Sequence, residues 1–290
     1  MIRRDLMIQH RISSFIFALA AVLTIGGASA AESAKYPDWR GQWERFVVRG
    51  LPGQPSHDQT RPWGFGQEAP LTGEYRKVLA DSIADQAQGG VGNFPTVFGR
   101  AAGMPYMMIA FGPMEWVVTP ETTYLLVGWH DHYRRIFTDG RDWPQTIAPA
   151  YAGYSIGRWI DEDGDGVYDT LMVETRAFKG PRAVDETGLP LHVDNQSIFK
   201  ERIWRDKANP RILHDEMTII DHAFTRPWTV DKRYVHNPNP RPEWIEFYTT
   251  ENNAQVKIGK ENYFLSWDGL LMPAKKNQPP PDLRYFNPSR

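Results

Sequence analysis

The sequence predicts a mainly β protein whose antiparallel strands close into a barrel, with one helix near the N-terminus. After residue 100, apolar and polar residues alternate with a period of two in run after run. The runs recur at spacings of about 10–20 residues, and Gly, Pro or Asp separates them. No helical pattern lies between them, as parallel βαβ units would require. Because a sheet of so many strands closes or folds over, we expect a barrel or a sandwich and predict the barrel.

The first 30 residues have the pattern of a secretory signal peptide. Arg3, Arg4 and Arg11 form a positive leader, residues 15–25 are largely apolar, and Ala28-Ser29-Ala30 is a cleavage motif. An uncleaved membrane anchor is the alternative, but the apolar run is well short of the about 20 residues that span a bilayer. We therefore expect cleavage before Ala31 and a mature chain in the periplasm or outside the cell.

Composition and charge exclude several function classes. The 33 basic residues nearly balance the 35 acidic ones, whereas a nucleic-acid-binding protein needs a clear basic excess. The absence of cysteine excludes a disulfide scaffold, a thiol nucleophile and cysteine-ligated metal. The sequence also lacks the common nucleotide-binding, serine-hydrolase and zinc-protease motifs. We expect no nucleotide, flavin or covalent-serine chemistry.

The helix is expected in the N-terminal third of the mature chain, after a strand within residues 39–48 and a loop over residues 50–66. Thr72 is a suitable N-cap, and Glu74 lies in the first turn, where it complements the helix dipole. Apolar residues then follow at helical spacing until Gly89-Gly90 stops the pattern. These signals predict one helix of about four turns.

The remaining elements are strands, and residues 31–290 show neither a repeat nor a linker, so a single domain is predicted. The tail from residue 273, with three consecutive prolines, is expected to be an extended surface segment. The strands are expected at residues 106–111, 115–119, 122–128, 133–138, 154–160, 170–178, 196–205, 212–221, 228–234 and 244–248.

Two resemblances support this fold. Gly41-Gln42-Trp43 resembles the G-x-W motif that opens lipocalins and other calycin barrels, in which the Trp closes the barrel base. Four further segments resemble, in the same order, the signature segments of a large group of exported bacterial proteins with no established activity. This resemblance implies a shared β fold and export, and it transfers no catalytic residue, whereas the calycin-like assignment comes from the strand pattern and the G-x-W motif. The segments are RRIFTDGR (134–141), GYSIGRW (153–159), DTLMVET (169–175) and TRPWTV (225–230).

The strongest local motif is the acidic run DEDGDGVYD at residues 161–169. Its spacing is that of a calcium loop, with a glycine at the turn position. Position 12 of the loop is Met172, so the bidentate Glu of an EF-hand is missing, and the flanks are predicted strands. We expect a structural Ca²⁺ site here, with a solvated hairpin turn as the alternative. The ligands would be Asp161, Asp163, Asp165, the carbonyl of Val167 and Asp169.

A second metal candidate is His130-Asp131-His132. Residues two apart on a strand share a face, so the two imidazoles could bind one transition metal. A third ligand would come from His192, His214 or His222. The alternative is a pair of exposed or core-rim histidines in a turn, where neighbouring side chains diverge.

A third group consists of polar residues on and between the C-terminal strands. If their face points into the barrel, they form a buried acid–base lining; if it points outward, they form surface ion pairs. For proton transfer, His192, Asp194 and Asp221 are the best candidates. The other members are Glu174, Arg176, Asn195, Glu201, His214, His222 and Arg226.

Three functions remain compatible with the sequence. The first is an exported binding protein whose cavity, lined by aromatic residues, holds a small apolar or aromatic molecule. The second is a cofactor-independent lyase, isomerase or hydratase that uses histidine and carboxylate side chains. The third is a calcium-stabilised interaction module of the cell envelope. The sequence alone does not decide whether the protein is an enzyme.

Overall fold

A computed structural model describes residues 34–53, 56–130, 132–245, 255–259, 261–265 and 271–273. The predicted signal peptide and Asp131 lie outside these residues. The chain divides into two compact units, residues 1–246 and residues 247–290, and each is described by itself.

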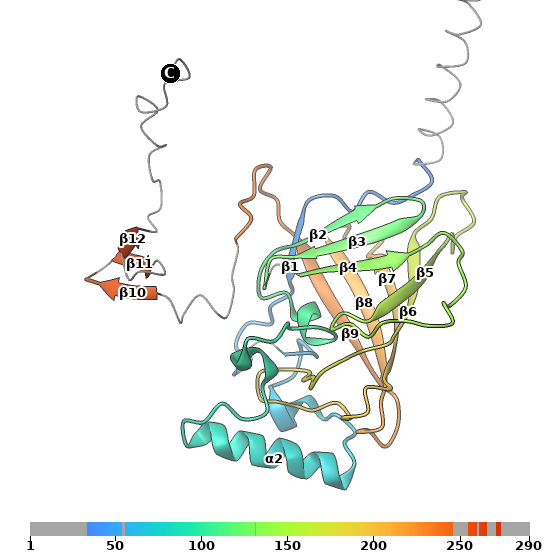
Figure 1. Cartoon of the computed structure of the whole chain (residues 1–290). Coiled ribbons are helices and arrows are strands. Elements are labelled where there is room, and N and C mark those ends of the chain that lie inside the picture. Colours follow the sequence, from blue (N-terminus) through green and yellow to red (C-terminus); the bar gives the residue numbers. More distant parts are fainter. Residues whose placement is uncertain are drawn as a thin grey trace, which may run out of the picture. The chain divides into compact units, whose positions relative to one another are not determined.

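The first unit contains a closed barrel whose nine strands follow one another in chain order (Figure 1). The last strand pairs with the first, so the barrel has no free sheet edge at that junction. The predicted barrel is therefore confirmed. Its strands are β1 (Gln42–Arg45), β2 (Met114–Val118), β3 (Thr122–Val127), β4 (His132–Phe137), β5 (Tyr154–Ile160), β6 (Thr170–Arg176), β7 (Ile198–Arg205), β8 (Ile212–Ile220) and β9 (Trp228–His236).

The barrel is mixed, because one junction departs from the mainly antiparallel arrangement that the sequence predicts. β4 and β5 pair in parallel, with Ile136 opposite Ser155 and Phe137 opposite Ile156. Every other pair of neighbouring strands in the barrel is antiparallel. Parallel neighbours need a connection that returns along the sheet. Residues 138–153 make that return without a strand or helix.

The predicted strand at residues 106–111 is also wrong, because η3 (Tyr106–Ile109) is a short 3₁₀ helix. All four of its residues are buried. A short apolar run with both faces buried has no alternation that would separate a strand from a helix turn. Two further 3₁₀ turns, η1 (Gly64–Gln67) and η2 (Pro95–Phe98), lie in segments without periodicity.

Large aromatic side chains fill interior positions of the barrel. Trp43 of the G-x-W motif is fully buried, and its indole N–H donates to the carbonyl of Trp39 at 2.9 Å. Trp39 packs against Trp116 at a centroid distance of 5.5 Å. The motif's glycine is required by geometry: Gly41 has φ of 94°, and a Cβ there would lie 2.6 Å from the ring of His236.

The predicted helix is confirmed as α2 (Gly73–Ala87). The hydroxyl of Thr72 caps it by accepting the backbone N–H of Tyr75 at 3.3 Å. Just before the helix, the N–H of Thr72 donates to the carbonyl of Ala223 at 2.8 Å. This bond ties the start of α2 to the turn between β8 and β9, where the candidate site lies.

The second unit is a three-stranded antiparallel sheet of β10 (Gln255–Ile258), β11 (Glu261–Leu265) and β12 (Leu271–Pro273). The strand predicted at residues 244–248 is absent at Trp244 and Ile245, and its other residues are not among those described. Within the described ranges, no helix is long and apolar enough to cross a membrane.

Candidate functional site

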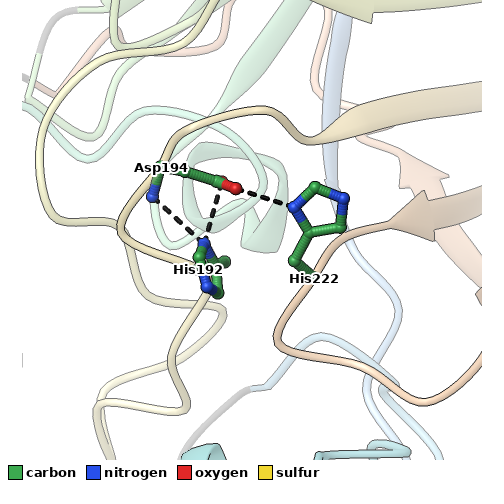
Figure 2. A group of neighbouring side chains, drawn as sticks. All are labelled: His192, Asp194 and His222. Atoms are coloured by element: carbon green, nitrogen blue, oxygen red, sulfur yellow. Dashed lines mark hydrogen bonds and ion pairs between the residues drawn. The ribbon is translucent and has the colours of Figure 1, made fainter.

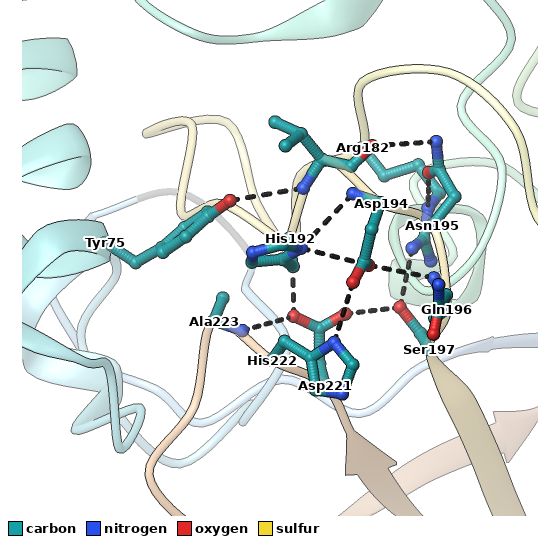
Figure 3. Close-up of polar contacts among 11 residues, drawn as sticks. Tyr75, Arg182, His192, Asp194, Asn195, Gln196, Ser197, Asp221, His222 and Ala223 are labelled. Atoms are coloured by element: carbon teal, nitrogen blue, oxygen red, sulfur yellow. Dashed lines mark hydrogen bonds and ion pairs between the residues drawn. The ribbon is translucent and has the colours of Figure 1, made fainter.

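Two loops meet at one end of the barrel and bring the predicted catalytic residues together. His192 and Asp194 lie in the loop before β7, and Asp221 lies directly after β8. Ile198 of β7 pairs with Ile220 of β8, so the flanking residues Ser197 and Asp221 are placed side by side. The strand register therefore brings the two loops into contact (Figure 3).

The carboxylate of Asp221 holds the two loops against each other. One oxygen accepts the backbone N–H of His192 at 2.8 Å and that of Ala223 at 2.8 Å. The other oxygen accepts the hydroxyl of Ser197. Asp221 is 8% exposed, and three donors already occupy it. These contacts occupy both carboxylate oxygens with donors from the two loops.

The loop residues place two imidazoles around the Asp194 carboxylate (Figure 2). The Nδ1 atom of His192 lies 3.0 Å from Oδ1 of Asp194, and Nδ1 of His222 lies 2.7 Å from Oδ2. One ligand atom from each residue lies within 4.8 Å of the others. Two imidazole nitrogens and one carboxylate oxygen form a donor set that suits a divalent transition metal.

A tight turn presents Asp194 between the imidazoles. The N–H of Asn195 donates to the carbonyl of His192 at 3.3 Å. Asn195 adopts a left-handed backbone with φ of 58°, which Asn tolerates better than most residues. The N–H of Gln196 then donates to Oδ1 of Asp194 at 3.0 Å. The sequence His-Val-Asp-Asn thus positions its own carboxylate by local hydrogen bonds.

Electrostatics keep Asp194 ionised and favour a proton on His222. Burial raises the pKa of Asp194, but the N–H of Gln196 and the two imidazoles outweigh it and lower this pKa to about 2. The hydrogen bond to Asp194 and its negative charge raise the pKa of His222 above its usual 6.5. The site therefore attracts positive charge, whether proton or metal ion.

The Nδ1 atom of His192 faces two groups with opposite demands. The backbone N–H of Asp194 lies 3.2 Å away and requires a lone pair on this nitrogen. Oδ1 of the same residue lies 3.0 Å away and would repel that lone pair. Nδ1 has a single lone pair, so it can accept this N–H or bind a cation that also contacts Oδ1, but not both.

Aromatic packing fixes one side of the site and leaves the other open. The ring of Tyr75 on α2 lies 5.1 Å from that of His192, and its hydroxyl accepts the N–H of Val193 at 3.2 Å. The side chains of His192 and Asp194 are 29% and 26% exposed, whereas that of His222 is 64% exposed. Solvent therefore reaches the site past His222.

Arg182 supplies positive charge behind the loops. Its Nη2 donates to the hydroxyl of Ser197 at 2.6 Å, and its Nε donates to the side-chain oxygen of Asn195 at 3.1 Å. Burial lowers the pKa of Arg182 to about 10, against the raising effects of Asp221 and Asp194. It therefore stays protonated at neutral pH and partly balances the two carboxylates. Sequence reasoning missed this residue.

The predicted calcium loop connects β5 and β6, and much of its charge is already satisfied. The Asp161 carboxylate accepts the N–H groups of Gly164 at 2.7 Å, Asp165 at 3.2 Å and Gly166 at 2.9 Å. The ammonium of Lys207 lies 2.7 Å from Asp163 and 3.5 Å from Asp169.

The carboxylates of this loop lie close to one another, but their contacts do not identify a bound ion. Oxygens of Asp161, Asp163 and Asp165 lie within 4.8 Å of one another. The predicted fourth ligand, Val167, donates its N–H to Asp165 at 2.8 Å. The Ca²⁺ site stays a prediction, since a lysine already provides positive charge beside the carboxylates.

Among the residues that the structure describes, His130 and His132 stay outside any larger group of potential ligands. His130 is 8% exposed, and burial together with the charge of His132 lowers its pKa to about 4. β4 begins only at His132, so the two residues do not share a strand face. In the described part of the chain, neither residue belongs to a group of three or more potential metal ligands.

Polar residues of the C-terminal strands divide between the two faces of the sheet. Glu174 and Arg176 pair with each other on the outside, and His214 contacts Asp231 at 2.9 Å. Glu201 instead points inward, where it forms a buried ion pair with Arg134.

The barrel interior holds further charged groups that sequence reasoning missed. Asp215 on β8 and Lys232 on β9 are both fully buried. The sequence held one signal for Asp215. On a strand, residues two apart point to the same face, and Asp215 lies between the apolar residues Leu213 and Met217 in that spacing.

Comparison with known proteins adds no functional assignment. No protein-family model matches the chain, and no curated protein matches it significantly. Function is therefore inferred from the side chains and their geometry.

Proposed function

We propose that this chain is an exported β-barrel protein that binds one divalent transition-metal ion through His192, Asp194 and His222. The observation that carries the proposal is the convergence of three ligand atoms within 4.8 Å of one another. They come from two loops that the Asp221 carboxylate holds together. Imidazole ligands favour transition metals over Ca²⁺ or Mg²⁺.

Three protein ligands suit a site that does more than hold its metal. Structural zinc sites are usually closed by four protein ligands, whereas catalytic sites have three and leave a position for water or substrate. A bound metal would lower the pKa of that water and polarise a ligand oxygen. Solvent access past His222, whose side chain is 64% exposed, fits such an open position.

The charges at the site act on metal binding in two ways. With its pKa lowered to about 2, Asp194 is ionised well below neutrality. The raised pKa of His222 means that a proton competes with the metal for this ligand. Metal affinity is therefore expected to rise with pH through the titration of His222.

One observation favours a metal-free acid–base function at the same site. The His222–Asp194 contact of 2.7 Å resembles the oriented histidine of a general base. In that case His222 would exchange the proton and Asp194 would orient it, whereas the sequence analysis expects His192, Asp194 and Asp221 to handle protons in a lyase, isomerase or hydratase. Asp221 would still act by positioning.

Export and the calycin-like assignment are part of the proposal. Export is supported by the charged, apolar and A-x-A segments of residues 1–30. The calycin-like assignment is supported by the buried Trp43 of the G-x-W motif in a closed barrel.

Calorimetric titration of the chelator-treated mature chain with Zn²⁺ and Co²⁺ tests the proposal. We expect one ion per chain, and an affinity at least about tenfold lower in His222→Ala and Asp194→Asn. His214→Ala is the matched control, because it removes an imidazole that also contacts a carboxylate, at 2.9 Å, outside the site. Co²⁺ should give visible absorption bands that both site variants lose. Absence of saturable binding to the wild type would overturn the metal proposal and favour the acid–base function.

A further inference from the structure

The parallel junction between β4 and β5 leaves part of the barrel wall open. β3 pairs with β4 along its whole length, from Val127 opposite His132 to Thr122 opposite Phe137. On the other side, β5 pairs only with Ile136 and Phe137. Residues 132–135 of β4 therefore have no strand partner toward β5 among the described residues. We call this opening, lined by residues 132–135, 137, 150–154 and 179, the β4–β5 slot.

The β4–β5 slot is an open cleft with a volume of about 440 Å³. Pockets for small molecules commonly have volumes of about 300–1,000 Å³, so this one suits a single small ligand. Tyrosines form much of its wall: Tyr133, Tyr151 and Tyr154. The side chain of Tyr133 is also unusually open for a large aromatic, with the residue 63% exposed. The slot thus offers flat apolar surfaces with polar edges.

Two cations in the slot have no carboxylate partner in the described part of the chain. Arg135 and Lys179 both line it, and neither forms an ion pair with another described residue. The guanidinium of Arg135 lies 4.8 Å from the ring centroid of Phe137, and the ammonium of Lys179 lies 4.9 Å from that of Tyr151. Aromatic rings therefore hold these cations near the slot without neutralising them.

The remaining charged group beneath the slot is already neutralised. Arg134 also borders it, but its guanidinium points into the barrel and pairs with Glu201. Thr175 and Ser155 accept its other donors at 2.6 Å and 3.1 Å. Among the described residues, the lining contains no acidic side chain. This described lining consequently carries a net positive charge that comes from Arg135 and Lys179.

We propose that the β4–β5 slot binds a small aromatic carboxylate. Its carboxylate would lie near Arg135 and Lys179, and its ring would pack against Tyr151 and Tyr154. Charge-assisted hydrogen bonds to a carboxylate are stronger than neutral ones, which favours an acid over its amide. This site is separate from the metal ligands and does not depend on the proposed function at His192, Asp194 and His222.

The test compares 1-naphthoate with its uncharged analogue 1-naphthamide, by fluorescence and calorimetric titration of the mature chain in EDTA. The chelator removes any contribution from a metal centre, so this result is independent of the metal titration. We expect saturable binding of the acid, at least about tenfold tighter than binding of the amide. The double variant Arg135→Gln/Lys179→Gln should remove that preference.

Two further variants separate charge from shape. Lys200→Gln removes an exposed lysine of β7 that does not line the slot, and it should leave both affinities unchanged. Tyr151→Leu keeps both cations and removes an aromatic wall, so it should weaken the acid and the amide alike. Equal affinity of the wild type for acid and amide would overturn the proposal. So would the absence of saturable naphthoate binding, or a naphthoate affinity that the double variant leaves intact.

Discussion

The Asp221 carboxylate accepts the backbone N–H of His192 at 2.8 Å, across a sequence separation of 29 residues. This bond joins the loop before β7 to the turn after β8. It matters because the proposed metal ligands are divided between these segments: His192 and Asp194 lie in one, and His222 lies in the other. The relative position of the ligands therefore depends on a residue that is not itself a ligand.

Replacing Asp221 should weaken metal binding without removing a ligand. In Asp221→Asn, the amide nitrogen cannot accept a hydrogen bond, so at least one of the three donors loses its partner. We expect the Co²⁺ affinity to fall by roughly 10–100-fold, as for other residues that orient metal ligands. Asp231→Asn, which alters a carboxylate beside His214, is the control. An unchanged affinity in Asp221→Asn would show that the loops hold their geometry without this carboxylate.

Replacing Asp194 should lower the pKa of His222. The hydrogen bond to Asp194 and its charge are the main causes of the raised pKa, and Asp194→Asn removes the charge. We expect the His222 pKa of the metal-free chain to move toward its usual 6.5, measured by NMR titration of the ring protons. A raised folded-state pKa stabilises the fold below pH 6.5, and this contribution is lost as pH rises through the raised value. A His222 pKa that stays raised in the variant would contradict the observed contact.

Strand alternation predicts the barrel well because burial on one face repeats every second residue. The alternation does not predict the structure where the two-residue repeat is absent, and it does not tell whether two neighbouring strands run parallel or antiparallel. Tyr106–Ile109 is buried on all sides and forms a 3₁₀ turn. The parallel pairing of Ile136 with Ser155 depends on how the connection before β5 returns, and no local pattern encodes this.

The candidate site could be predicted only in part. His192 and Asp194 stand out as polar residues two apart, but their contact with His222 depends on the register of β7 against β8. That register is a long-range property. Asp215 and Lys232 are missed for a different reason. Charged residues on a strand are normally assigned to the solvent face, whereas these two point into the barrel.

The acidic loop gives a direct test of calcium binding. If Ca²⁺ binds at Asp161, Asp163 and Asp165, it must displace the ammonium of Lys207 from Asp163, where the two groups lie 2.7 Å apart. Added Ca²⁺ should then raise the melting temperature of the mature chain, and EDTA should reverse the rise. The double variant Asp163→Ala/Asp165→Ala should abolish this response. A melting curve that does not respond to Ca²⁺ in the wild type would eliminate the site.

Removing one partner of the buried Arg134–Glu201 pair should lower the free energy of unfolding strongly. Replacing both partners with apolar residues should lower it much less. Both side chains are at most 1% exposed. Glu201→Gln leaves the guanidinium without its counter-charge, and we expect a loss of about 3–5 kcal/mol in the free energy of unfolding. The apolar double variant Arg134→Met/Glu201→Leu should recover much of that loss. Urea denaturation measures both. Arg176→Ala, which breaks a surface pair, should cost less than about 1 kcal/mol.

Asp215 should make the barrel less stable as pH rises from acid toward neutral. Burial raises the pKa of this carboxyl well above its usual 3.8, and the negative charge of Glu201 raises it further. Above pH 3.8 and up to the raised value, the folded chain keeps a proton that the unfolded chain has released. The free energy of unfolding therefore decreases with pH in this window.

Lys232 should act in the opposite direction at higher pH. Burial lowers its pKa from 10.5 to about 8, so between these values the unfolded chain holds the extra proton and stability rises with pH. Urea denaturation at a series of pH values measures both slopes. In Asp215→Asn the decrease from pH 4 toward neutrality should flatten, because the amide does not titrate. If the variant keeps the wild-type slope, another group carries the proton. The interior of the barrel would then hold Asp215 as an ion, and Lys232 would be its counter-charge.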